Sequence, residues 1–242
     1  MEIKPELLDK VFPNAPVKEV AYEIRFAPLL RVQRDLADFQ GQIVSDYPTY
    51  TTEPIMLDTD RVQGWRFSSD DRGRTVRVTE RSFGFITNRY VSFEQYKSEL
   101  LRLQDAFAKV FDIQAIKRVG LRYVNNIMVQ FGQGQPLFLQ YVNPVIDLTR
   151  LKEAEIVRFA CEVQLKRARG VLMMRTGLIE VPPGGSGKPE EQAVYILDLD
   201  FQNEGPLVLP GSKLLDDFHD EIQKEFLAHL KDTYLPIMET SK

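Results

Sequence analysis

The sequence predicts an α+β fold in which a curved, mainly antiparallel sheet carries helices on one face. Several segments of the 242-residue chain alternate apolar and polar residues, which is typical of strands with one buried face. Short turns such as Ser69-Asp70-Asp71-Arg72-Gly73 join neighbouring strands, and this favours antiparallel pairing. Other segments repeat apolar residues at the spacing of amphipathic helices. Helices on one face leave the second face to a partner, a ligand or its own polar side chains.

The first half of the chain is expected to form a strand, a helix, three strands and a helix. Residues 17–26 alternate cleanly and predict the first strand, and a helix follows over residues 32–43, with Pro48 as its stop. Shorter strands are expected near residues 62–69, 74–80 and 83–89. Ser92-Phe93-Glu94-Gln95 has the form of a capping box and predicts the start of the second helix. Its apolar stripe consists of Tyr96, Leu100, Leu103, Phe107 and Val110.

The second half repeats this element order. A long strand is predicted over residues 115–129, and residues 136–148 fit a short helix between two prolines. Three strands are then expected, at residues 155–166, 171–181 and 193–201. The last helix, which Pro236 is expected to end, has an apolar stripe of Leu215, Phe218, Ile222, Phe226 and Leu230. We therefore predict a β-α-β-β-β-α pseudo-repeat of residues 1–112 and 113–242, with both halves packed as one globular unit.

The composition excludes several classes of protein. Hydrophobic residues make up 43% of the chain and charged residues 27%, as in ordinary globular domains. No run of 18 apolar residues is present, and residues 1–6 lack the features of a secretory signal. The single cysteine, Cys161, cannot form an intramolecular disulfide, and the formal net charge of -4 provides no global attraction to nucleic acid. We expect a cytoplasmic protein that does not associate with membranes.

Charged and polar side chains gather on one face of two predicted strands. The strand over residues 115–129 turns Arg118, Arg122 and Asn126 away from its apolar side. The first strand carries Glu19, Glu23 and Arg25 in the same way. If the two strands lie near each other, these groups form either cross-strand ion pairs on a solvated face or a site for an anionic or zwitterionic ligand. In the second case, arginine side chains present planar donor forks to the ligand.

The sequence motifs that resemble functional sites predict no catalytic centre. Residues 184–188 resemble a phosphate-binding loop, but prolines stand at positions 182 and 189, so residues 181–190 predict a simple connection between strands. His219 and His229 lie ten residues apart on one helix, which is too far to share a metal. For Asp198 and Asp200, ion pairs with a neighbouring strand are favoured over a cation site. We expect no cofactor and no metal.

A local basic patch offers a different kind of site. Lys166, Arg167 and Arg169 surround the turn before Gly170, where they are able to neutralise a few phosphates. No aromatic residues are interleaved with them, which favours a solvated turn over a nucleic-acid site.

Three short patches resemble a sporadically distributed prokaryotic family of about this length. They are Asn14-Ala15-Pro16-Val17-Lys18-Glu19-Val20 running into Glu23-Ile24-Arg25-Phe26, the central Gly120-Leu121-Arg122-Tyr123-Val124-Asn125, and Phe218-His219-Asp220 before an amphipathic helix. The resemblance spans nearly the whole chain but implies no chemistry, because no activity is established for the family. The patchy distribution of the family is similar to that of mobile or defence-associated genes. It implies an accessory role beside the product of a neighbouring gene.

Taken together, these observations favour a binding module over an enzyme. A partner protein or small ligand is expected on the polar sheet face, at Glu19, Glu23, Arg25, Arg118, Arg122 and Asn126. One alternative is a carrier or enzyme for a hydrophobic small molecule, because a long helix over an antiparallel sheet resembles helix-grip folds. The other alternative is nucleic-acid binding through the basic patch at residues 166–169. The oligomeric state does not follow from the residues.

Overall fold

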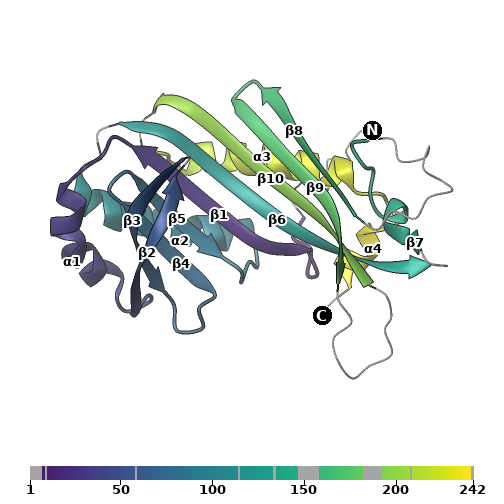
Figure 1. Ribbon diagram of the computed structural model, residues 1–242, viewed down its shortest axis with the longest axis horizontal. Coiled ribbons are helices and arrows are strands. Elements are labelled where there is room, and N and C mark those ends of the chain that lie inside the picture. The colour runs from purple at the N-terminus through teal and green to yellow at the C-terminus, as the bar shows by residue number, and fades with distance from the viewer. Residues whose placement is uncertain are drawn as a thin grey trace. The chain divides into compact units, whose positions relative to one another are not determined.

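The computed structural model of the chain describes residues 7–8, 10–57, 59–113, 115–132, 135–146, 158–181, 192–207 and 209–240 (Figure 1). By compactness the chain divides into two units. The first unit consists of Glu19–Arg122 and Phe201–His219. The second unit consists of Met1–Lys18, Tyr123–Asp200 and Asp220–Lys242. Because these boundaries fall inside secondary-structure elements, three strands and a helix contribute residues to both units.

The described strands belong to one antiparallel sheet with the order β2-β3-β4-β5-β1-β6-β10-β9-β8, and β7 pairs with β6. They are β1 (Val17–Phe26), β2 (Thr49–Leu57), β3 (Asp60–Ser68), β4 (Arg74–Thr79), β5 (Ser82–Thr87), β6 (Ile116–Gly132), β7 (Gln135–Pro136), β8 (Phe159–Arg167), β9 (Gly170–Val181) and β10 (Gln192–Leu207). In both halves of the sequence, the first strand lies beside the last one (β1 by β5, β6 by β10). From β5 the sheet continues through β4 and β3 to β2, and from β10 it continues through β9 to β8. The first half of the sequence contains one strand more than the predicted β-α-β-β-β-α order, because β2 was not predicted.

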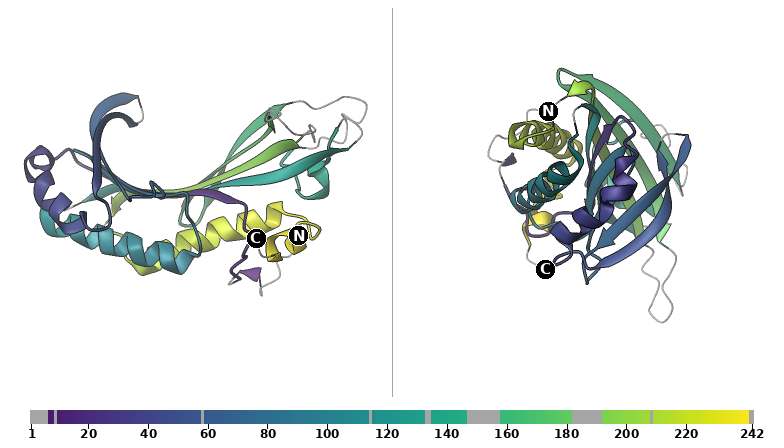
Figure 2. Two further views of the ribbon diagram at one scale, coloured as in Figure 1. Left: turned by 90° about the horizontal axis from the view of Figure 1, so that it is seen from below. Right: turned by 90° about the vertical axis from the view of Figure 1, so that its left-hand side faces the viewer.

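The helices of the first unit are α1 (Arg31–Ile43), α2 (Phe93–Phe111) and the beginning of α3 (Ser212–His229). Helix α2 begins where the capping box predicts, since the Ser92 side chain accepts a hydrogen bond from the backbone N–H of Gln95 at 3.3 Å. It ends at Asp112, which has a left-handed backbone with φ of 45°. Helices α1 and α2 lie over the same face of this unit's strands (Figure 2).

Aromatic rings fill the space between these helices and the strands. Phe39 of α1 contacts Phe67 of β3 and Phe83 of β5, with ring centroids 5.8 and 6.4 Å apart. Phe107 of α2 contacts Phe83 at 4.7 Å and Phe39 at 5.5 Å, and it also packs on Phe26 and Phe111. Rings in edge-to-face and tilted contact stabilise a core beyond the area that they bury. This cluster holds both helices to one face of the strands.

The second unit has its own core, between strands β8 to β10 and the end of α3. Tyr195 of β10 stacks on Phe138 of the 3₁₀ turn Leu137–Gln140 at 5.6 Å, and its phenol oxygen lies 2.5 Å from His229 Nε2. A short helix, α4 (Leu235–Glu239), follows and accepts the backbone N–H of Asn14 at the Met238 carbonyl, 3.0 Å away. No helix among the described residues is long and apolar enough to cross a membrane.

The predicted fold class is confirmed, and β1 has the predicted bounds. Strand β2 was missed, because as an outer strand it is exposed along most of its length and contains Pro54, so it lacks the alternation of a half-buried strand. The last helix ends at His229, and Pro236 lies in the first turn of α4 instead. Strand β10 extends beyond its predicted end to Leu207. Residues 155–157 and 182–190, within an expected strand and an expected connection, lie outside the described residues.

The ring cluster predicts which core substitution is most damaging in the first unit. Phe107→Ala removes a fully buried ring that contacts several others, and is expected to lower the free energy of unfolding by about 3–5 kcal/mol. Val91→Ala, at a side chain that is 62% exposed, is the matched control and should change it by less than about 0.5 kcal/mol. Urea unfolding of both variants measures the difference. Similar values for the two would contradict the packing described here.

Candidate functional site

The face of the first unit's strands that points away from α1 and α2 has a floor of small residues. Along one row of the sheet, Arg66 of β3 lies opposite Arg77 of β4, Arg77 opposite Gly84 of β5, and Gly84 opposite Glu23 of β1. The next row contains Gly64, Thr79, Ser82 and Arg25 in the same order. Thr79 and Ser82 are buried and bonded to each other at 2.8 Å. Long charged side chains therefore surround a floor of glycines and hydroxyls.

The floor requires glycine at its centre. A Cβ on Gly84 would lie 3.0 Å from the Tyr22 carbonyl oxygen, closer than ordinary contact. On Gly64 the side chain of Ile55 occupies the place of a Cβ. Neither position leaves room for a larger residue without a shift of its neighbours.

The structure brings together three of the predicted site residues. The Nε of Arg25 donates to Glu23 Oε1 at 2.6 Å, and Nη1 of Arg118 donates to the same oxygen at 3.1 Å. Arg118 also donates from Nε to the side-chain oxygen of Gln202 on β10 at 2.7 Å. All four residues are half-buried. We call Arg25, Glu23 and Arg118 the central triad.

The other predicted residues are placed differently. Glu19 lies on the same strand as Glu23 and its charge acts on Arg77. Arg122 is half-buried on the part of β6 that belongs to the first unit. Asn126 belongs to the second unit, where its backbone N–H donates to the Pro16 carbonyl at 2.8 Å.

A second group of the same kind, missed from the sequence, lies toward the β2 edge. Glu53 Oε1 is 2.7 Å from Nη2 of Arg66 and 3.6 Å from Nε of Arg77. We call these three residues the edge triad. The alternation of β3 and β4 places both arginines on this face. Glu53 was not predicted to join them, because its strand, β2, was not predicted.

The two arginines of the edge triad are in an unfavourable setting. They lie directly opposite each other on neighbouring strands, where like charges repel. Burial is the largest cause that lowers the pKa of Arg77, and the charge of Arg66 adds to it. Carboxylates of Glu53, Glu19 and Glu23 act in the opposite direction. Both Nε atoms are enclosed without a hydrogen-bond partner in the described part of the chain.

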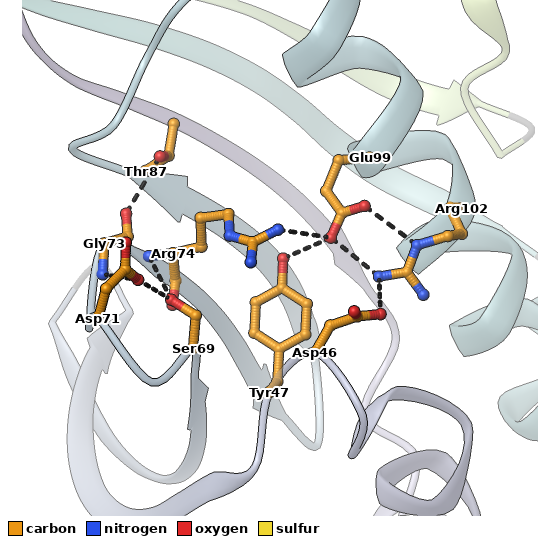
Figure 3. Close-up of polar contacts among 9 residues, drawn as sticks. All are labelled: Asp46, Tyr47, Ser69, Asp71, Gly73, Arg74, Thr87, Glu99 and Arg102. Carbon is orange, nitrogen blue, oxygen red and sulfur yellow. Dashed lines mark hydrogen bonds and ion pairs between the residues drawn. The ribbon is translucent and has the colours of Figure 1, made fainter.

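A different polar cluster joins the turn after α1 to α2 and to the start of β4 (Figure 3). The buried Tyr47 donates from its phenol to Glu99 Oε1 at 2.7 Å, and Arg102 donates to both oxygens of Glu99 at 2.9 and 3.0 Å. Arg74 lies over the Tyr47 ring, 5.5 Å from its centroid, and 3.6 Å from Glu99. Asp46 pairs with Arg102 at 3.0 Å. Each charge has an opposite partner, so this cluster works as a structural link.

The turn between β3 and β4 positions Arg74 for that link (Figure 3). Asp71 accepts the hydroxyl of Ser69 at 2.6 Å and the backbone N–H of Gly73 at 2.9 Å. Ser69 in turn accepts the backbone N–H of Arg74 at 3.1 Å. The hairpin turn predicted from these residues therefore forms, closed by an Asx-type hydrogen bond at Asp71 and with Arg72 in the left-handed region at φ of 53°.

Burial and hydrogen bonds together set the ionisation of Tyr47 and Glu99. Burial raises the pKa of Tyr47, and the bond to Glu99 adds to the effect. For Glu99, burial acts to raise the pKa, but the hydrogen bonds from Arg102 and Tyr47 outweigh it, so its pKa lies below the ordinary value. Glu99 thus stays ionised at neutral pH.

The basic patch of the second unit is partly neutralised. Arg167 donates to Glu225 at 2.7 Å, while Lys166 and Arg169 are exposed. Close by on β9, Arg175 bonds to Glu162 of β8 at 2.6 Å and lies 3.5 Å from Asp198 of β10. Asp198 thus takes part in a cross-strand ion pair, as favoured from the sequence. Among the described residues no group of histidine, cysteine or acidic side chains is arranged to hold a metal ion.

Both histidines belong to packed interiors. His219 stacks on Phe93 at 3.8 Å, and burial, the main cause, lowers its pKa to about 4. Burial also lowers the pKa of His229 to about 4, beside Tyr195. At neutral pH both imidazoles are therefore uncharged.

No protein-family model matches this chain, and no curated protein matches its sequence. Its function is therefore inferred from the groups that the fold brings together.

The link between Tyr47, Glu99 and Arg102 predicts a pH-dependent contribution to stability. Glu99→Gln should lower the free energy of unfolding by about 1–3 kcal/mol at neutral pH, because an ionised acceptor of several hydrogen bonds is lost. Since the folded-state pKa of Glu99 is depressed, its contribution is present above the ordinary pKa and is lost as the pH falls through the folded value.

Unfolding of wild type and variant between about pH 7 and pH 3 measures this, and the difference should shrink on acidification. Glu94→Gln on the same helix, at an exposed carboxylate, is the control. A difference that stays constant with pH would contradict the assigned role of Glu99.

Proposed function

We propose that this protein is a binding module rather than an enzyme, and that the charged sheet face of the first unit binds an anionic partner. The partner is a segment of another protein or an anionic small ligand. The observation that carries the proposal is the pair of triads, each with two guanidinium groups around one carboxylate. The resemblance to a sporadically distributed family further suggests an accessory role, and we propose that the protein acts in the cytoplasm.

The geometry of the triads supports recognition of an anion. Carboxylates, and for Arg118 also Gln202, hold the guanidinium groups in place, so little freedom is lost when a ligand binds. The side chains of Arg66 and Arg77 are 35% and 40% exposed, so their ends are accessible from solvent. Partly desolvated guanidinium groups form stronger bonds to an anion than fully solvated ones.

The chemistry of this face supports binding over catalysis. Its groups are arginines, glutamates, hydroxyls and glycines, and an arginine stays protonated throughout the physiological range. General acid–base catalysis needs a group with a pKa near the working pH. The two histidines have pKa values of about 4 and lie in packed interiors, away from this role.

The alternatives have weaker support. A carrier for a hydrophobic molecule needs space between helices and sheet, whereas in the first unit aromatic rings in mutual contact lie there. Nucleic-acid binding through residues 166–169 is weakened because Glu225 pairs with Arg167. Neither of these observations weighs against binding at the charged sheet face.

The test measures binding of a labelled peptide of alternating glutamate and serine by fluorescence anisotropy at low salt. We expect Arg118→Gln to weaken binding about tenfold, since it removes a charge-assisted donor, and Arg122→Gln to weaken it less than Arg118→Gln does. Arg34→Gln, on α1 beside Asp35, removes the same charge away from the face and is the matched control.

A peptide of alternating glutamine and serine should not bind. If folded Arg118→Gln protein binds the acidic peptide as tightly as wild type, or if wild type does not bind it, the proposal is wrong. Native mass spectrometry of the purified protein adds the subunit count and shows whether a small ligand is retained.

A further inference from the structure

The edge triad carries more positive than negative charge. Two guanidinium groups, of Arg66 and Arg77, share the single carboxylate of Glu53, and both contacts are made to one oxygen, Oε1. Three residues therefore carry a net charge of +1 in a half-buried setting. A second carboxylate would pair each guanidinium group with its own anion.

The positions of the two arginines add a second observation. They occupy directly opposed sites of β3 and β4, and the enclosed Nε atom of each has no hydrogen-bond partner in the described residues. Opposed like charges and enclosed donors without a hydrogen bond both oppose folding, so neither is explained by stability of the isolated chain. Such local violations are typical of functional sites.

We infer that the edge triad is the anchor for an acidic side chain, aspartate or glutamate, of a partner protein. The inference rests on the proposed function and names the class of partner and the point of contact. The incoming carboxylate binds the exposed ends of Arg66 and Arg77 and leaves Glu53 in place between them. Ile55, next to Glu53 on β2 and lying over Gly64, offers an apolar contact to the methylene groups of that side chain.

Charge on the rest of the face favours a protein over a nucleic acid. Glu19 and Glu23 lie near Arg77 on the same face, and their charges act on it. A phosphate chain carries a negative charge at every nucleotide and would meet these carboxylates. A protein segment presents separate carboxylates, and its other side chains are free to be neutral or basic opposite the glutamates.

The edge of the sheet is less suited to hold the partner by its backbone. Among the described strands β2 pairs with β3 alone and forms the edge of the sheet, but Pro54 lies in its middle. Proline on an outer strand removes a donor and guards against the addition of a further strand. We therefore assign recognition to the side chains of the triad.

The experiment uses the full chain, the same labelled glutamate–serine peptide and three single variants. Arg77→Gln and Arg66→Gln are each expected to weaken peptide binding about tenfold, because each removes half of the donor pair. Glu53→Gln is expected to tighten binding about threefold or more, because the loss of a carboxylate that competes for the arginines outweighs the loss of its hold on their side chains. Arg34→Gln again controls for the loss of one positive charge.

The opposite direction of these effects separates binding from a structural role. All three triad variants remove a member of the same ion-pair group, so a purely structural role would move stability and binding in one direction. Urea unfolding of each variant confirms that it is folded. The conservative variants Arg66→Lys and Arg77→Lys each keep the charge but remove the planar fork. Each should bind the peptide more tightly than the corresponding glutamine variant and less tightly than wild type.

Several results would overturn the inference. If Glu53→Gln weakens binding as the arginine variants do, the triad is a structural element. If Arg118→Gln reduces binding while the edge-triad variants leave it unchanged, the proposed function stands and the anchor is wrong. A single-stranded oligonucleotide that binds more tightly than the peptide, and loses affinity in Arg77→Gln, would replace the protein partner by a nucleic acid. If wild type binds neither probe, the proposed function fails as well.

Discussion

The packing of aromatic rings against one face of the first unit's strands is the constraint from which the other features of that unit follow. Phe39 and Phe107 reach from two helices to the rings of β3 and β5, and this contact fixes which residues of each strand point inward. A shift of register by one residue would exchange the two faces and place charges in the core. The arginines and glutamates must therefore lie on the opposite face, in rows that the strand pairing defines.

That opposite face, which none of the described helices of this unit covers, shows how a sheet accommodates charge. Glycines and hydroxyl residues form its floor, and arginine and glutamate side chains lie over them and exclude water from the floor. Removing charges from water is costly, and pairing them offsets the cost only where each has a partner. The central triad and the edge triad use the same arrangement of two arginines around one glutamate, on either side of Gly84.

The polar clusters of the first unit differ in how completely their charges and donors are matched. Around Tyr47 and Glu99 the donors and acceptors match, and the cluster joins helices that already pack together. In the edge triad two arginines share one oxygen, and enclosed donors are left over. A matched network is explained by stability alone, whereas a mismatched and half-exposed one needs a further reason. We propose that the binding of an anion provides that reason.

The sequence by itself determined the faces of the strands, because the direction of a side chain along a strand depends only on the local period of two. Glu23, Arg25 and Arg118 were therefore placed on one face, and the start of α2 followed from the capping residues around Ser92. Only the tertiary structure decided that Arg118 meets Glu23 and Gln202, that Asn126 belongs to the other unit, and that Glu53 joins Arg66 and Arg77. These contacts depend on the pairing of strands far apart in the chain, and β2, exposed along most of its length, has no alternation from which its place is predictable. Pairing is set by the packing of the whole core, which no local pattern encodes.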